Sequence, residues 1–288
     1  MKHKLILGTA QIGLNYGINN FQGKIILEDA LSILKYAYDE RISYLDTAEA
    51  YGDAHLIIGE YHKQNPDSKF RIITKVPKSN TQSLFLKVEE YIEQLAVEFI
   101  DVLMFHSFET FVNNFDKNKN EILDLKQKGL IKQSGVSIYT NDQFEQVIDT
   151  DWIDVIQLPF NLFDNKLKRG ELIKRAKEKN KIIHTRSAFL QGIFFMDRNH
   201  TNNVVRELQS YLYTIDNICN KEKISMSTLA LTYCLNQAEI DNVLIGIDNL
   251  KQLQQNIEDS EAILPSNIIN IIDMINIEND ELLNPSLW

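Results

Sequence analysis

The sequence predicts an α/β protein in which eight strand and helix units form a single (β/α)8 barrel over residues 1–288. Two observations support this fold class. Short runs of β-branched and aliphatic residues recur along the chain, and between them lie longer segments whose apolar residues repeat with helical spacing. Strands that alternate with helices form parallel sheets, and no linker rich in proline, glycine or serine divides the chain, so we expect one domain.

The expected strands are short and spread along the whole chain. They are Lys4–Leu7, Ser43–Asp46, Arg71–Val76, Asp101–His106, Gln133–Ser137, Val155–Leu158, Lys181–Thr185 and Asn242–Ile245. Amphipathic spacing predicts helices between them, such as Leu27–Glu40 and Ser83–Leu95. The gap before the last strand is about twice as long as the others. It predicts an extra helix around Val204–Asn220 ahead of Met226–Leu235, and a helical tail is expected from about Pro265.

A doubly wound open sheet is the alternative architecture. That fold would place a glycine-rich phosphate-binding turn after an early strand. The segment Gly8–Gly13 (GTAQIG) has neither the GxGxxG pattern nor a Lys-Ser/Thr pair after its second glycine. The barrel is therefore favoured.

Composition and charge exclude several classes of protein. With 44% hydrophobic and 24% charged residues, the chain has an ordinary globular composition. Its 40 acidic and 30 basic residues give a net charge of −10, which argues against a nucleic-acid-binding surface. Cys219 and Cys234 lack partners at metal-ligand or disulfide spacing, so we expect no metal site and a reducing, cytoplasmic setting. No run of about 18 apolar residues occurs, so no membrane span is expected.

Polar residues close three consecutive apolar runs. In a barrel of this kind the active site forms where the carboxyl ends of the strands meet. Asp46 ends the second expected strand with Tyr51 shortly after it, Lys75 closes the third run, and His106 ends the fourth. Each residue alone has an ordinary structural explanation, but a titratable residue at the end of three successive strands predicts a shared catalytic site.

These residue types suit proton transfer to a carbonyl oxygen. Tyrosine is a weak acid, with an ordinary pKa near ~10, so we expect the Lys75 ammonium to lower the pKa of Tyr51. Asp46 would keep Lys75 protonated and oriented, and His106 would donate a hydrogen bond to the substrate oxygen. The pattern indicates Tyr51 as the general acid of a carbonyl reduction.

Six motifs carry a resemblance to a known family. DTAEAYG at 46–52, ITK at 73–75 and MFH at 104–106 resemble the Asp-Tyr-Lys-His tetrad of the aldo-keto reductases. GVS at 135–137, QLPFN at 157–161 and GIDNLKQLQQN at 246–256 resemble the family's cofactor-binding segments, in the same order. The resemblance implies an NAD(P)H-dependent oxidoreductase that reduces an aldehyde or ketone to an alcohol, with Tyr51 as the proton donor.

The same resemblance assigns residues to the cofactor, NADP(H) or NAD(H). They are Ser137, Gln157, Arg186, Ser187, Phe189, Gln191, Gly246, Asp248, Gln252, Gln255 and Asn256. Two positions depart from the family pattern. Ile138 stands where Asn is usual, and Arg186 stands where an aromatic ring commonly stacks on the nicotinamide, although a planar guanidinium can stack as well. Asp248 would repel a 2′-phosphate and only Lys251 would attract one, which favours NADH while both cofactors stay open.

The substrate is indicated only by loop sequences. Gln11 and Tyr16 would overhang the pocket, and His55 would either touch the substrate or lie on the surface of the following helix. The segments GTAQxGLxYG, QLPFN and RSxFLQG resemble bacterial aldo-keto reductases associated with surface-carbohydrate biosynthesis. That resemblance suggests a sugar-derived carbonyl compound. Whether Trp288 covers the pocket or packs outside it stays open, as does the oligomeric state.

Two alternative functions remain at this point. A nicotinamide-binding barrel can act as a regulatory or scaffolding subunit with little turnover. A sugar epimerase that uses the nicotinamide transiently would need the same four residues. Fold alone does not separate these functions from net carbonyl reduction.

Overall fold

The computed structural model describes residues 1–18, 20, 22–78, 82–113 and 115–288. Eight parallel strands close into a barrel in sequence order, and β8 pairs with β1 to complete it. The strands are β1 Leu5–Gly8, β2 Tyr44–Asp46, β3 Arg71–Val76, β4 Ile100–Phe105, β5 Ile131–Ser137, β6 Val155–Pro159, β7 Ile182–Arg186 and β8 Asn242–Ile245. The predicted fold class is confirmed, and two of the expected strands, the third and the eighth, match residue for residue.

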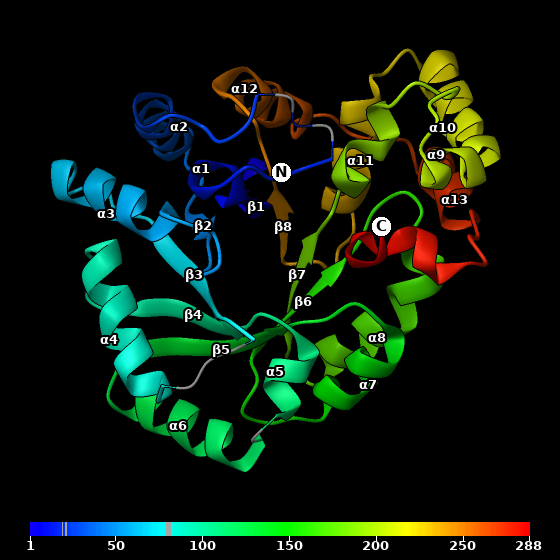
Figure 1. The fold of residues 1–288 in the computed structure, drawn as a ribbon. Helices are drawn as coiled ribbons and strands as arrows, with labels where there is room; N and C mark the ends of the chain where they lie inside the picture. Colours follow the sequence, from blue (N-terminus) through cyan, green and yellow to red (C-terminus); the bar gives the residue numbers. More distant parts are fainter. Residues whose placement is uncertain (19, 21, 79–81, 114) are drawn as a thin grey trace.

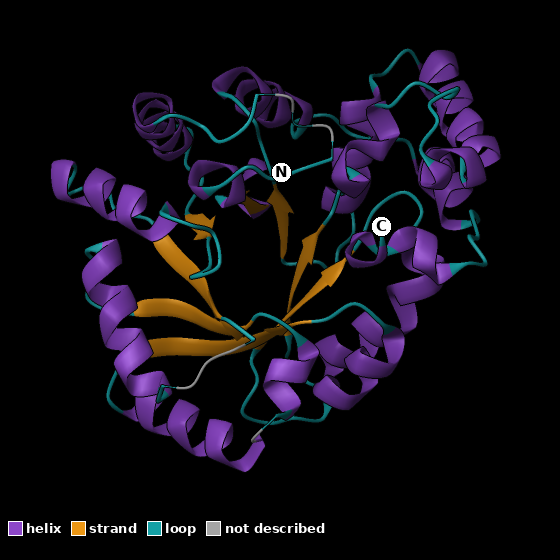
Figure 2. Ribbon diagram, in the orientation of Figure 1, coloured by secondary structure: helices purple, strands orange, loops and turns teal. Residues whose placement is uncertain are grey.

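Helices surround the strands on the outside of the barrel (Figures 1 and 2). The helices between strands are α1 Ala10–Gly13, α2 Leu27–Asp39, α3 Ala54–Gln64, α4 Leu84–Leu95, α5 Phe108–Val112, α6 Phe115–Gln127, α7 Asn141–Ile148, α8 Lys166–Glu178 and α11 Met226–Leu235. The connection between β7 and β8 also contains a short 3-10 segment, η2 Leu190–Phe195. Where one extra helix was predicted, two follow each other, α9 Asn203–Glu207 and α10 Gln209–Glu222.

Apolar spacing decides which face of each helix is buried. On α2 the buried side chains are Ala30, Ile33, Leu34 and Ala37, the repeat of i, i+3, i+4 and i+7 that predicts a helix packed against a sheet. Helix α4 shows how an end is fixed, because the Ser83 side chain accepts a hydrogen bond from a backbone N–H of its first turn. These local signals agree with the tertiary packing, so the sequence specifies the outer ring.

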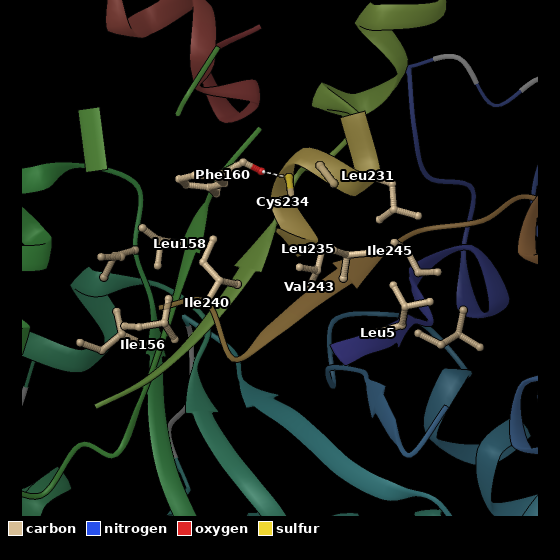
Figure 3. Close-up of a cluster of buried hydrophobic side chains, with 14 of the residues drawn as sticks. Leu5, Ile156, Leu158, Phe160, Leu231, Cys234, Leu235, Ile240, Val243 and Ile245 are labelled. Atoms are coloured by element: carbon tan, nitrogen blue, oxygen red, sulfur yellow. Dashed lines mark hydrogen bonds between the residues drawn. The ribbon is translucent and has the colours of Figure 1, made fainter. Parts of the chain in front are cut away.

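The core has two parts, one inside the barrel and one between strands and helices. Inside, the apolar side chains of Ile6, Ile73, Val102, Met104 and Val155 pack together. Outside, α11 packs on β8, and Figure 3 shows this cluster, in which the Cys234 thiol donates a hydrogen bond to the Phe160 carbonyl oxygen 3.4 Å away. Cys234 is fully buried, so it acts as a small apolar residue of the core.

The alternation of side chains along each strand decides which residues reach the mouth of the barrel. On β3, Ile73 fills the interior and Lys75, two residues later, lines the cavity at the carboxyl end. On β4, Met104 fills the interior and His106 follows the strand at the same end. The barrel therefore delivers the predicted catalytic side chains to one face.

The first and last parts of the chain are tied to the barrel by polar contacts. The segment η1 Lys2–Lys4 precedes β1, and the Lys4 ammonium donates to the carbonyl oxygens of Gln237 and Ile240 at 3.1 and 2.8 Å, just before β8. After β8 come α12 Leu250–Asp259, α13 Ser266–Asp273, η3 Asp280–Leu283 and η4 Pro285–Leu287. The Asn165 amide donates to the carbonyl oxygens of Ile272 and Ile275, which holds this helical tail against the start of α8. Among the described helices, none is both long and apolar enough to cross a bilayer.

Candidate active site

A cavity of about 540 Å³ opens at the carboxyl end of the barrel. Its volume lies in the range of small-molecule and cofactor sites, which is ~300–1,000 Å³. It extends from the strand ends to the first turns of α12, and the loops after β1 and β7 contribute to its walls. All the residues assigned to the site from the sequence line it, except His55.

Asp46 and Lys75 form a buried ion pair at the ends of β2 and β3, with side chains 1% and 2% exposed. The Lys75 ammonium also donates to the Thr47 carbonyl oxygen at 3.0 Å and to the Tyr51 hydroxyl. The second Asp46 oxygen accepts a hydrogen bond of 2.8 Å from the Gln157 amide. Burial works to lower the pKa of Lys75, but Asp46 and Tyr51 outweigh it and raise that pKa above its usual value. The ammonium therefore stays protonated.

The structure corrects the expected direction of the Tyr51 pKa. Burial raises the pKa of Tyr51 above its ordinary value, and the positive charge and hydrogen bond of Lys75 only oppose this increase. The reason is that burial costs the phenolate more hydration free energy than its interaction with the Lys75 ammonium restores. Tyr51 therefore carries its proton at neutral pH, as a general acid must before it reacts.

His106 lies beside Tyr51, with the two ring centroids 5.8 Å apart and the rings almost perpendicular at 83°. Burial, together with the nearby Lys75 charge, lowers the pKa of His106 to about 4. The imidazole is consequently neutral at pH 7, so one ring nitrogen carries a hydrogen to donate. Tyr51 and His106 thus present two hydrogen-bond donors to the same cavity.

Arg186 ends β7 and lines the same cavity as Tyr51. Its guanidinium lies over the Tyr139 ring, 4.1 Å from the centroid, and donates to the Ile138 carbonyl oxygen at 3.1 Å. Two longer contacts of 3.4 Å join it to the hydroxyls of Ser137 and Ser187. Tyr139 lies beneath one face of the guanidinium, and Arg186 as a whole is half-buried.

The last of the predicted cofactor segments lies at the start of α12. Asn249 caps this helix by accepting from the Gln252 backbone N–H at 3.0 Å, and the Gln252 side chain in turn accepts from the Asp248 N–H at 2.7 Å. A Cβ on Gly246 would stand only 3.1 Å from the Gln11 amide, so glycine allows the loops after β1 and β8 to approach closely. Unpaired N–H groups and the dipole at a helix N-terminus suit anionic groups such as a pyrophosphate. The N-terminus of α12 is therefore a candidate position for the pyrophosphate of a dinucleotide.

His55 is not part of the cavity, which corrects both expectations for it. Its side chain is 3% exposed and lies behind β3, where Nε2 is 2.8 Å from the Thr74 hydroxyl and Nδ1 is 3.2 Å from the Gln94 amide oxygen. The ring also contacts the edge of Tyr91 at a centroid distance of 5.0 Å. Burial lowers the pKa of His55 to about 4. It therefore neither touches the cavity nor lies on the surface.

Several cavity residues were missed from the sequence. They are Thr9, Asn20, Tyr139, Phe195, Ser227 and Pro285, among others. Tyr139 could have been found, because it lies two residues after Ser137 and alternation places it on the same side. Pro285 could not, since only the path of the tail brings it to the cavity. Trp288 does not line the cavity, and its indole N–H donates to the Glu281 carbonyl oxygen at 3.2 Å.

Comparison with known proteins defines the family. A model described as "Aldo/keto reductase family" matches residues 4–277. The probable aldo-keto reductase 1 of Glycine max is 25% identical, covering 87% of this chain and 79% of that protein. The NADH-specific methylglyoxal reductase of Escherichia coli is 23% identical, covering 87% of each. The structure of a glycerol dehydrogenase from Gluconobacter oxydans superposes with a TM-score of 0.75, at 21% identity and coverage of 94% and 90%.

The chain therefore belongs to the aldo/keto reductase family. It is an oxidoreductase of this family, whose members act on carbonyl compounds with nicotinamide cofactors.

Proposed function

We propose that this protein reduces an aldehyde or ketone to an alcohol with NADH, and that Tyr51 gives the proton to the carbonyl oxygen. One observation supports this most strongly. The Lys75 ammonium, fixed by Asp46, donates to the Tyr51 hydroxyl, and the neutral His106 lies beside the Tyr51 ring in the same cavity. Such a set of donors is complementary to the charge that develops on a carbonyl oxygen during reduction.

Each of these residues has a separate task. Asp46 holds Lys75, and Gln157 holds the second oxygen of Asp46, so the pair cannot rotate freely. As negative charge grows on the substrate oxygen, Tyr51 releases its proton to that oxygen and Lys75 stabilises the phenolate that remains. His106 donates a hydrogen bond that orients the carbonyl. A bound nicotinamide would supply the hydride.

The cofactor would extend from the tetrad to α12. The nicotinamide amide would contact Ser137 and Gln157. The amide oxygen of Gln157 has no hydrogen-bond partner among the described residues, whereas its amide nitrogen donates to Asp46. The phosphates would meet the loop from Gly246 to the N-cap Asn249, and the adenosine would meet Gln255 and the buried Asn256. Ser187, Phe189 and Gln191 would cover it from the β7 side.

NADH is preferred over NADPH in this proposal because of where the charges lie. The cationic side chains among the described lining residues are Lys75 and Arg186, both at the tetrad end. The α12 end carries Asp248, whereas Lys251 is exposed and does not line the cavity. A 2′-phosphate near Asp248 would be repelled, while a ribose hydroxyl could donate to its carboxylate. The similarity to an NADH-specific relative supports the same choice.

For the substrate we propose a sugar-derived carbonyl compound. Polar side chains from the loops after β1 and β7 surround the mouth, and they can hydrogen-bond the hydroxyls of such a molecule. They are Gln11 and Gln191. The likeness of these loop sequences to reductases of surface-carbohydrate biosynthesis points in the same direction.

Cofactor binding is the first test. The purified protein is titrated separately with NADH and NADPH, and nicotinamide fluorescence or heat is followed. We expect saturable binding that is tighter for NADH. Absence of binding of both at millimolar concentration would contradict the proposal.

Turnover is then tested with sugar-derived aldehydes. Net loss of NADH absorbance with alcohol formation supports reduction. Substrate isomerisation with no net NADH loss would show an epimerase instead.

A further inference from the structure

Among the residues that the structure describes, the Arg186 guanidinium has no carboxylate partner. Four other arginines, at positions 71, 169, 175 and 198, form ion pairs with Asp or Glu. Arg41 and Arg206 are exposed to solvent. Within the described ranges Arg186 is half-buried, lines the cavity and makes polar contacts only with two hydroxyls and a carbonyl oxygen. A positive charge that is partly removed from water without a counter-ion is costly.

The guanidinium is also held in a fixed orientation. The Tyr139 ring supports one face, and the hydrogen bond to the Ile138 carbonyl oxygen anchors one nitrogen. A guanidinium has five N–H donors, and the three contacts to Ser137, Ser187 and Ile138 leave donors unused. An arginine held in this way can bind a carboxylate or a phosphate in bidentate fashion at small entropic cost.

The side chains at the tetrad end of the cavity carry an excess of one positive charge. The charges of Lys75 and Asp46 cancel, and His106 is neutral at pH 7, so Arg186 leaves one uncompensated positive charge. Its positive charge opposes the increase that burial causes in the pKa values of Tyr51 and Tyr16, and it contributes to the lowered pKa of His106. Asp248, the other lining carboxylate, belongs to the α12 end of the cavity.

We propose that the substrate is a carbonyl compound that carries an anionic group, a carboxylate or a phosphate, and that Arg186 binds this group. This inference rests on the proposed reductase function and narrows its substrate class. The alternative role of Arg186 is to stack on the nicotinamide. Loss of stacking would change kcat/KM by the same factor for all substrates, whereas loss of an anion contact would change kcat/KM only for anionic substrates.

Matched substrates separate the two roles. Glyceraldehyde is compared with glyceraldehyde 3-phosphate, and butanal with succinic semialdehyde, which also distinguishes phosphate from carboxylate. We expect the wild-type enzyme to prefer the anionic member of at least one pair in kcat/KM. Because a hydrogen-bonded charge pair contributes strongly to binding, Arg186→Gln should reduce that preference roughly 10- to 100-fold, mainly through KM. Arg186→Lys should restore part of it.

Two controls complete the design. Arg206→Gln removes the same charge from the exposed face of α9 and should leave the preference unchanged. Direct titration of the NADH-bound protein with succinate and with inorganic phosphate gives a readout that needs no turnover. We expect saturable binding of at least one anion to the wild type and its loss in Arg186→Gln.

The proposal is overturned if Arg186→Gln lowers kcat/KM equally for both members of each pair. It is also overturned if the variant loses NADH affinity by the same factor as its activity, or if neither anion binds the NADH-bound wild type. Failure of the proposed function looks different, because then no carbonyl compound oxidises NADH at all. In that case the anion titration still decides whether Arg186 forms an anion site.

Discussion

The imidazole of His55 accepts a hydrogen bond from the hydroxyl of Thr74, the residue that precedes Lys75 on β3. The Gln94 amide nitrogen donates to Glu90, so its oxygen faces His55 and requires a hydrogen on Nδ1. Nε2 then has a lone pair, which lies 2.8 Å from the Thr74 oxygen. His55 lies in the first turn of α3, shortly after Tyr51, so these hydrogen bonds join the segment that follows Tyr51 to the strand that carries Lys75.

His55 is therefore predicted to position the tetrad from behind. In His55→Leu, Thr74 and Gln94 would lose their buried partner, and we expect a loss of about 1–3 kcal/mol in unfolding free energy. We also expect a lower kcat with little change in NADH affinity, because the cofactor wall at α12 is remote. Urea unfolding and NADH titration measure both quantities. Activity equal to wild type would contradict the positioning role, and His55→Gln, which can replace one bond, should retain more activity than His55→Leu.

Acid should destabilise the fold through buried histidines. Burial lowers the pKa values of His55, His106 and His184 to about 4, compared with 6.5 in the unfolded chain. Between these two values the unfolded chain binds more protons than the native protein, so stability is lost as the pH falls from about 6.5 to about 4. Urea unfolding at pH 7 and at pH 4.5 measures this loss, and unchanged midpoints would contradict it.

His184 offers a direct test of that linkage. It is 2% exposed inside the barrel next to Tyr44, and its Nδ1 has no hydrogen-bond partner among the described residues. A buried histidine with this pKa contributes on the order of 3 kcal/mol to the acid sensitivity. His184→Leu should remove that part of the pH dependence while costing little at pH 7, because the unsatisfied nitrogen disappears. If the difference in unfolding free energy between pH 7 and pH 4.5 is the same in His184→Leu as in the wild type, groups other than His184 cause the acid sensitivity.

Tyr51→Phe should abolish reduction without loss of cofactor binding. Removal of the general acid is expected to lower kcat about 10²- to 10⁴-fold. The shape of the pH profile is a second readout, since the raised pKa of Tyr51 keeps its proton in place and the wild-type rate should decline only above the ordinary range for tyrosine. Stopped-flow kinetics and NADH titration measure these effects. Wild-type turnover in Tyr51→Phe would exclude it as the proton donor.

Asp248 should determine cofactor preference. Asp248→Lys replaces a repulsive charge with an attractive one near the proposed 2′ position, so NADPH should bind about 10-fold tighter relative to NADH. Titration with both cofactors gives the ratio. Lys251→Gln is the matched control, because Lys251 is exposed and does not line the cavity, and its ratio should stay at the wild-type value.

The barrel and most of its mouth could be predicted because the information is local. Polar residues at the ends of apolar runs, such as Asp46 and Lys75, mark the active end once strands and helices alternate. Properties that depend on packing could not be predicted in the same way. The Tyr51 pKa depends on how far the cavity encloses the phenol, and the burial of His55 depends on α4, which begins almost thirty residues later. The break between α9 and α10 at Leu208 could not be predicted either, because no glycine or proline at this point indicates the end of a helix.

The closure of the barrel between β1 and β8 has a consequence for folding during synthesis. The four tetrad residues have all been synthesised by residue 106, whereas the loop at Gly246 follows β8, which pairs with β1 across more than two hundred residues. A growing chain therefore carries all four proposed catalytic residues long before the proposed dinucleotide site can form. Because such distant pairings form slowly, we expect NADH binding only after the barrel has closed, and we expect no carbonyl reduction by an incomplete chain.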